Sequence, residues 1–312
     1  MLFIRTYIYT FCSFMIAAVL LVACDDIIEV DTGTSEPVLN IDAWVNDKEE
    51  TQVITLTFTQ DYFDNTSPVP GVRGASVTLT DDQGGVYIFQ EDTASDDGSY
   101  RWRPDPGMSL GRTGTSYTLT VEYNGETFVA SSKMGRVPAV DSITFSKQDD
   151  MGPPSNEDFY QAEFWAKDIA GTGDTYWIRT YKNGSLLNKA SEINIAYDAA
   201  QSAGSEFDGV TFITPIRKGI NANDEDEDGE PVSSLDPGDS VYVEIHSITL
   251  ASFNYLNEVI DQTDRNGGLS ELFTSTPLTN VSTNMVNLNA NGSPVVGFFN
   301  VASVSGLGRK FR

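Results

Sequence analysis

This chain has few of the residues that build disulfides, zinc sites and nucleic-acid-binding surfaces. Its 312 residues include two cysteines, one histidine and 19 lysines and arginines, against 45 aspartates and glutamates. With so few thiols and imidazoles, neither a disulfide scaffold nor a typical zinc site is expected. The excess of acid predicts repulsion from nucleic acids and anionic lipid surfaces. The sequence also has no glycine-rich phosphate loop, so no nucleotide partner is expected.

A long apolar run is found only near the N-terminus. Residues 1–23 carry one charge, Arg5, and end in the segment FMIAAVLLVA directly before Cys24. This layout predicts a secretory signal peptide over residues 1–23. A membrane anchor is the alternative, but Thr10 and Ser13 interrupt the apolar stretch, and a span needs about 20 apolar residues.

The sequence Leu21-Val22-Ala23-Cys24 resembles the bacterial lipobox, whose cysteine is acylated, for example with palmitate, and becomes the new N-terminus. Two or three acyl chains would hold the protein firmly, because each buried CH₂ contributes about 0.8 kcal/mol. Since Cys12 lies in the segment to be removed, the mature chain would have no free thiol and no disulfide. Its stability must then come from a packed core.

Acidic residues follow the cysteine at once, at Asp25, Asp26, Glu29 and Asp31. This flank resembles the signal that exports Bacteroidota lipoproteins to the cell surface. In other Gram-negative bacteria, an aspartate after the cysteine resembles an inner-membrane retention signal instead. Cleavage would leave 289 residues with 18 basic and 45 acidic side chains. The 17 Phe and 13 Tyr are too many for a disordered acidic chain, so a folded body on a tether is expected.

Apolar and polar residues alternate with a period of two along much of the chain, which is typical of half-buried antiparallel strands. In the first half, the strands are expected at residues 38–45, 53–58, 75–80, 86–90, 100–103, 116–123 and 126–131. Asn124-Gly125 joins the last two as a strong hairpin turn. We therefore expect a lipid-anchored linker over residues 24–36 and an Ig-like or transthyretin-like β-sandwich over residues 37–136.

Val137-Pro138 marks a break, after which a second β domain is expected over residues 137–312. Its strands are predicted at residues 160–167, 175–182, 240–248 and 295–301. One helix is predicted at residues 252–262, because Phe253, Leu256 and Ile260 form an apolar stripe that would pack across the second sheet. The fold class is thus mainly β, with two β-sandwich domains and one short amphipathic helix.

The order of several short motifs resembles the Bacteroidota lipoprotein family called domain of unknown function 4249. These motifs lie at residues 74–79, 98–100, 117–121, 207–209, 238–241, 253–256 and 297–299, so the resemblance extends over nearly the whole mature chain. The resemblance implies an outer-membrane lipoprotein whose gene often neighbours a TonB-dependent receptor. It implies no catalytic residues, because no activity is established for the family.

Residues 224–229 read Asp-Glu-Asp-Glu-Asp-Gly, an alternating carboxylate spacing that can wrap a Ca²⁺ ion. Asp224, Asp226 and Asp228 are the candidate ligands. The twelfth loop position is Leu235, where an EF-hand needs a bidentate glutamate, so an EF-hand is not expected. A calcium loop of another kind and a solvated acidic loop both remain open. No other cofactor is expected.

Two further groups of residues are candidate sites. His246 is predicted on a strand with Tyr242 and Glu244, and without a Gly-x-Ser-x-Gly elbow it indicates a surface or core-edge histidine rather than a catalytic one. Two roles remain open for five aromatic residues: they pack in a core, or they form a platform that binds a sugar or peptide. These residues are Tyr62, Phe63, Trp102, Trp165 and Trp177.

We therefore expect a non-enzymatic outer-membrane lipoprotein, displayed at the cell surface through Cys24. It would act as a binding or accessory subunit of a TonB-dependent transport system. One alternative is a subunit of an outer-membrane assembly or surface complex that binds no small ligand. A secreted hydrolase is another, although among 45 acidic residues any single carboxylate pair is uninformative.

Overall fold

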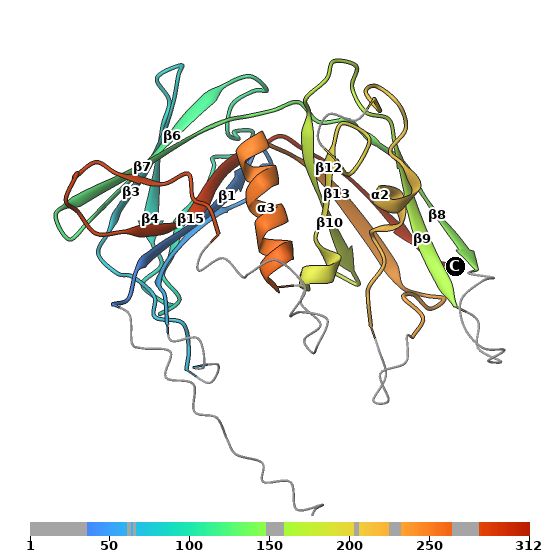
Figure 1. Ribbon diagram of the computed structural model, residues 1–312, viewed down its shortest axis with the longest axis horizontal. Coiled ribbons are helices and arrows are strands. Elements are labelled where there is room, and N and C mark those ends of the chain that lie inside the picture. Colours follow the sequence, from blue (N-terminus) through green and yellow to red (C-terminus); the bar gives the residue numbers. More distant parts are fainter. Residues whose placement is uncertain are drawn as a thin grey trace, which may run out of the picture. The chain divides into compact units, whose positions relative to one another are not determined.

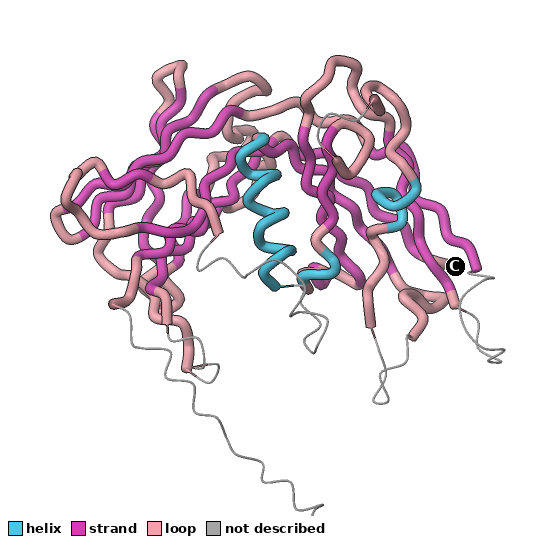
Figure 2. Tube along the Cα trace, viewed as in Figure 1, coloured by secondary structure: helices cyan, strands magenta, loops and turns pink. Residues whose placement is uncertain are grey.

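The computed structural model describes residues 36–60, 64, 67–147, 159–202, 206–224, 232–263 and 281–312. Their regular secondary structure is mainly β-strand, as predicted (Figures 1 and 2). Pro37–Gln60 and Asp64–Arg312 belong to one compact unit. The other unit, Met1–Glu36 with Asp61–Phe63, lies outside the described residues except for Glu36.

A nine-stranded sheet contains all the strands between residues 39 and 133, together with two strands from the C-terminal segment. Its order is β14 (Val286–Asn287), β7 (Glu126–Lys133), β6 (Ser116–Tyr123), β3 (Ser76–Asp81), β4 (Val86–Glu91), β5 (Ser99–Trp102), β2 (Gln52–Phe58), β1 (Leu39–Asn46) and β15 (Val295–Ala302). Neighbours are antiparallel except β1 and β15, which pair in parallel from Leu39 opposite Val295 to Asn46 opposite Ala302. The first strand is therefore paired with a strand from the far end of the sequence.

Burial alternates along several strands, as the alternating sequence pattern predicts. In β6, Tyr117, Leu119 and Val121 are buried, whereas the residues between them are partly exposed. The predicted Asn124-Gly125 turn is confirmed, with φ angles of 52° and 79° that suit a tight two-residue hairpin.

The two ends of the nine-stranded sheet approach each other. The Val301 N–H of β15 donates to Ser132 Oγ of β7 at 3.1 Å. Beside β14, Asn284 Oδ1 accepts from the Phe299 N–H at 2.9 Å, and Asn284 Nδ2 donates to the Phe299 carbonyl at 2.8 Å. The sheet therefore curls around its own buried face, where Ile41, Leu79, Tyr100 and other side chains form the first core.

The remaining strands form two smaller sheets. One contains β11 (Ser185–Leu186), β10 (Thr175–Lys182), β13 (Ser240–Ile248) and β16 (Val304–Lys310), with β12 (Asn194–Tyr197) paired to β10, and the other contains β8 (Val140–Lys147) and β9 (Tyr160–Ala166). Two short helical segments, η1 (Ala190–Glu192) and α2 (Thr214–Lys218), accompany them. Phe164 of β9, Tyr176 of β10 and Val243 of β13 meet in a second core.

The predicted helix is present as α3 (Leu250–Thr263), with Phe253 and Leu256 buried. It contacts β10 and β12 on one side and β15 on the other, as Figure 1 shows. Tyr255 of α3 packs 4.5 Å from Phe298 of β15, and Trp44 of β1 packs edge-on against Trp177 of β10 at 5.1 Å between ring centroids. Aromatic rings thus join the sheets beneath the helix. None of the helices in the described ranges has the length and apolar character needed to cross a bilayer.

The predicted domain boundary at residue 137 remains a prediction, but strand pairing crosses it. β15 pairs with β1, and β14 pairs with β7. The alternating pattern predicts that a segment is a strand, but it does not say which strand lies beside it. Strands β1–β7 are therefore completed by residues from the C-terminal segment.

Candidate functional site

Several predicted site residues lie outside the described part of the chain. These are Cys24, Asp226, Asp228, Tyr62 and Phe63. Of the predicted calcium ligands only Asp224 is described, and its Oδ1 accepts from Lys189 Nζ at 2.6 Å. The predicted site in this loop therefore remains a prediction.

The three described tryptophans of the predicted aromatic platform belong to separate groups of contacts. Trp102 packs edge-on against Tyr87 at 5.0 Å, beside the first core. Trp165 lies under the Arg217 guanidinium at 4.3 Å, and Trp177 belongs to the cluster beneath α3. The structure does not bring these three rings together into one flat surface.

His246 lies in a buried polar network on β13. The residue is 5% exposed, and its Nε2 lies 2.9 Å from Glu244 Oε2. The other oxygen of Glu244 accepts from Lys48 Nζ at 2.7 Å. Because Lys48 follows β1, this network connects the nine-stranded sheet with the sheet that contains β13.

The protonation states in this network follow from burial and hydrogen bonding. Burial alone would raise the pKa of Glu244, but hydrogen bonds from His246 and Lys48 outweigh it and lower that pKa to about 2. Burial lowers the pKa of His246 below its ordinary 6.5, against the opposing effect of Glu244. At neutral pH, a neutral imidazole therefore donates its Nε2–H to a charged carboxylate. This arrangement fits the core-edge histidine that the sequence indicated.

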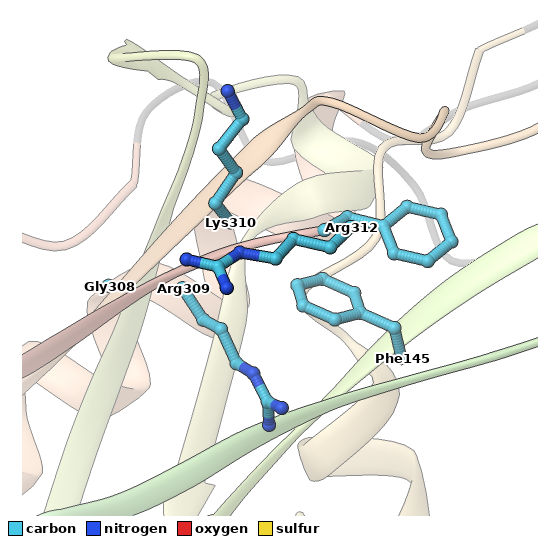
Figure 3. Close-up of a pocket in the computed structure, with 6 residues that line it drawn as sticks. Phe145, Gly308, Arg309, Lys310 and Arg312 are labelled. Atoms are coloured by element: carbon cyan, nitrogen blue, oxygen red, sulfur yellow. The ribbon is translucent and has the colours of Figure 1, made fainter.

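An open pocket of about 500 Å³ lies between β8 and the segment that includes the end of β16. It is lined by Phe145, Gly308, Arg309, Lys310, Phe311 and Arg312 (Figure 3). The rings of Phe145 and Phe311 stack at 4.9 Å with 23° between their planes. Figure 3 shows Arg309 and Lys310 projecting to opposite sides of the strand, as neighbours in a strand do.

The pocket combines aromatic rings with positive charge. The Arg309 guanidinium lies 5.8 Å from the Phe145 ring centroid, and its Nη1 donates to the Ile143 carbonyl. Among the described residues, no carboxylate forms an ion pair with Arg309, Lys310 or Arg312. In a chain with a net charge of −26, this local positive charge favours an anionic group.

The sequence interpretation missed this pocket, although it contains a signal. Residues 309–312 read Arg-Lys-Phe-Arg, with three cations among four residues. Guanidinium groups bind carboxylates and phosphates through paired hydrogen bonds. The second aromatic wall, Phe145, lies more than 160 residues earlier, so only the fold brings it to this place.

Comparison with known proteins gives a family but no activity. A search among curated proteins finds no similar sequence. The sequence model of one protein family matches residues 25–306, which is most of the chain and confirms the resemblance of its motifs. The chain therefore belongs to the family described as domain of unknown function (DUF4249).

Proposed function

We propose that this protein is a lipid-anchored outer-membrane protein at the cell surface that acts as a binding or accessory subunit of a TonB-dependent transport system. The observation that carries the proposal is the lipobox-like sequence ending at Cys24, with its acidic flank. The family match adds support because it begins at residue 25, directly after this cysteine. The family module would then follow the anchor without an intervening domain.

The pocket beside β16 is the candidate contact for a partner or ligand. Lys310 and Arg312 are exposed, so they are available to a carboxylate or phosphate group. The stacked rings of Phe145 and Phe311 offer an apolar face next to these charges. Such a combination suits an acidic ligand or an acidic surface of a receptor, and opposite charge would speed the encounter.

The first experiment is an affinity purification of the full-length protein from gently solubilised outer membranes, with Cys24→Ala as the control. Mass spectrometry should find acyl groups on Cys24 and a TonB-dependent receptor at near-stoichiometric yield, and the control should lose both. An unmodified Cys24 would refute the anchor. Recovery of the acylated protein alone, or with assembly factors and no such receptor, would refute the transport role.

A second experiment tests the pocket. Lys310→Ala combined with Arg312→Ala removes two exposed cations but keeps Arg309, which bonds the Ile143 carbonyl. Recovery of the receptor should fall at least tenfold, with no change in the unfolding temperature. Lys133→Ala, which removes an exposed cation at the end of β7, is the matched control. Equal recovery with both variants would exclude the pocket as the contact.

A further inference from the structure

Three aspartates converge where the loops after β9 and β12 meet. Asp168 follows β9, Asp198 follows β12, and Asp208 lies in the segment leading to α2. One carboxylate oxygen from each lies within 4.8 Å of the other two. Asp168 and Asp198 are 3% and 0% exposed, and Asp208 is half-buried. These residues are distinct from the acidic loop at residues 224–228.

Neutral donors hold the three carboxylates in place. Asp168 accepts from the Tyr176 hydroxyl at 2.7 Å and from the Gly209 N–H at 3.0 Å. Asp198 accepts from the N–H groups of Gly173 at 2.8 Å and Asp174 at 2.9 Å. Asp208 accepts from the Gly171 N–H at 2.8 Å. These bonds orient the carboxylates toward one another. None of the donors carries a positive charge.

One oxygen of the cluster has no donor at all. Asp198 Oδ1 accepts both of that residue's hydrogen bonds, whereas its Oδ2 is buried and has no hydrogen-bond partner. A buried polar atom without a partner is costly, and more so when it carries charge. An unpartnered carboxylate oxygen beside two further carboxylates indicates that a cation belongs there.

Arg136 is close enough for its charge to interact with Asp168, but its hydrogen bonds go to other groups. Arg136 Nε donates to Asp174 Oδ1 at 3.0 Å, and its Nη2 lies 2.7 Å from Asp174 Oδ2. Its Nη1 donates to the Ala170 carbonyl at 2.9 Å. Within the described ranges, no basic side chain forms an ion pair with Asp168, Asp198 or Asp208.

We propose that Asp168, Asp198 and Asp208 form a Ca²⁺ site. Calcium takes six to eight oxygen ligands at about 2.3–2.6 Å, so two ligands on opposite sides of one ion are about 5 Å apart. The 4.8 Å limit on the three oxygens therefore allows them to share one ion. Magnesium requires near-ideal octahedral geometry and retains several waters, which suits a largely buried, irregular set of carboxylates less well. The bound ion would tie together the loop after β9, the turn after β12 and the segment leading to α2.

The test uses the full-length protein stripped with EDTA and titrated with CaCl₂ by calorimetry. One ion should bind per chain, and at a hundred times the Kd the unfolding temperature should rise by about 5 °C or more. Terbium should also bind and emit when tyrosine is excited, because the Tyr176 hydroxyl lies 2.7 Å from Asp168 Oδ1. No binding of either ion by the wild-type chain would overturn the proposal.

Three variants locate the site. Asp198→Asn and Asp208→Asn should each weaken Ca²⁺ binding at least tenfold, whereas Asp224→Asn should leave it unchanged. Asp208 is half-buried and accepts one N–H, which an amide oxygen also accepts, so this variant should fold even if Asp198→Asn does not. Binding that is lost in Asp224→Asn and kept in Asp208→Asn would place the metal in the acidic loop and overturn the assignment.

Discussion

At the scale of single residues, the buried network of Lys48, Glu244 and His246 is the arrangement with the clearest energetic consequence. Glu244 is 2% exposed and depends on Lys48 for its counter-charge. A buried ion pair contributes little net free energy, but removal of one partner leaves the other charge uncompensated.

Lys48→Met should therefore lower the free energy of unfolding by about 3 kcal/mol, as measured by urea denaturation. Lys133→Met, which replaces an exposed lysine that forms no ion pair with any described residue, should change it by less than about 0.5 kcal/mol. Equal effects of the two substitutions would show that the network makes no special contribution.

The network also predicts a dependence of stability on pH. The pKa of His246 is lowered in the folded protein, so the unfolded chain binds the proton first as the pH falls below about 6.5. Folding stability is then present above pH 6.5 and is lost as the pH falls toward the folded pKa, by at most about 1.4 kcal/mol per pH unit. Glu244 titrates lower, between its ordinary value of 4.5 and about 2.

His246→Gln should flatten the change in unfolding free energy between pH 7 and pH 5, because Gln has no proton to gain there. Its amide N–H still donates to Glu244, and the raised pKa of Lys48, caused by hydrogen bonds to Glu244 and Glu50 that outweigh burial, keeps that lysine charged in this window. The measurement is urea unfolding of both proteins across that range. An unchanged slope in the variant would assign the pH dependence to other groups.

At the scale of elements, β15 shows why a strand can be predicted without its partner. Residues 295–301 were predicted as a buried strand, and β15 spans Val295–Ala302. Its parallel partner β1 lies at the other end of the chain, where no local pattern indicates it. The close approach depends on Gly297, which has φ 97° and whose added Cβ would lie 2.2 Å from the Ile41 carbonyl oxygen.

Gly297→Ala should thus lower the free energy of unfolding by about 2–4 kcal/mol through backbone strain and overlap with β1. Gly107→Ala is the matched control, since Gly107 also has positive φ, 78°, but has open space around it. It should lose only about 1–2 kcal/mol from the left-handed backbone. Thermal or urea unfolding of the two variants separates the overlap from the φ penalty, and equal losses would mean that β1 moves aside without cost.

Strand β16 was not predicted because Gly306 and Gly308 weaken the alternating pattern. The structure shows that a larger residue would be crowded at both positions. A Cβ on Gly306 would meet the Tyr242 hydroxyl at 2.5 Å, and one on Gly308 would meet the Tyr242 ring at 3.1 Å. Tyr242 of β13 therefore lies across β16, and the glycines make room for it.

At the scale of the whole molecule, the N-terminal strands depend on the C-terminal segment. Met285, Phe299 and Val301 are part of the first core, and β15 covers the outer edge of β1. A fragment of residues 37–136 would expose that edge and leave a gap in the core.

We expect the isolated fragment of residues 37–136 to be unfolded or aggregated, whereas the full-length protein should unfold in one cooperative transition. Circular dichroism and amide NMR dispersion would distinguish these outcomes. A fragment with dispersed resonances and its own cooperative unfolding would establish the predicted boundary at residue 137 as that of an independent domain.

The sequence by itself determined the local features of this protein. Period-two alternation located most strands, Asn124-Gly125 located a hairpin, and the apolar stripe of Phe253, Leu256 and Ile260 located α3. These signals are local because backbone geometry repeats every two or 3.6 residues. The order of short motifs also led to the family.

Only the tertiary structure decided which distant residues meet. The pairing of β1 with β15, the pocket of Phe145 with residues 309–312, and the convergence of Asp168, Asp198 and Asp208 all join separate segments. In a chain with 45 acidic residues, no single aspartate stands out by sequence. The role of an aspartate depends on its burial and on which other charges lie beside it, and both are determined only by the folded structure.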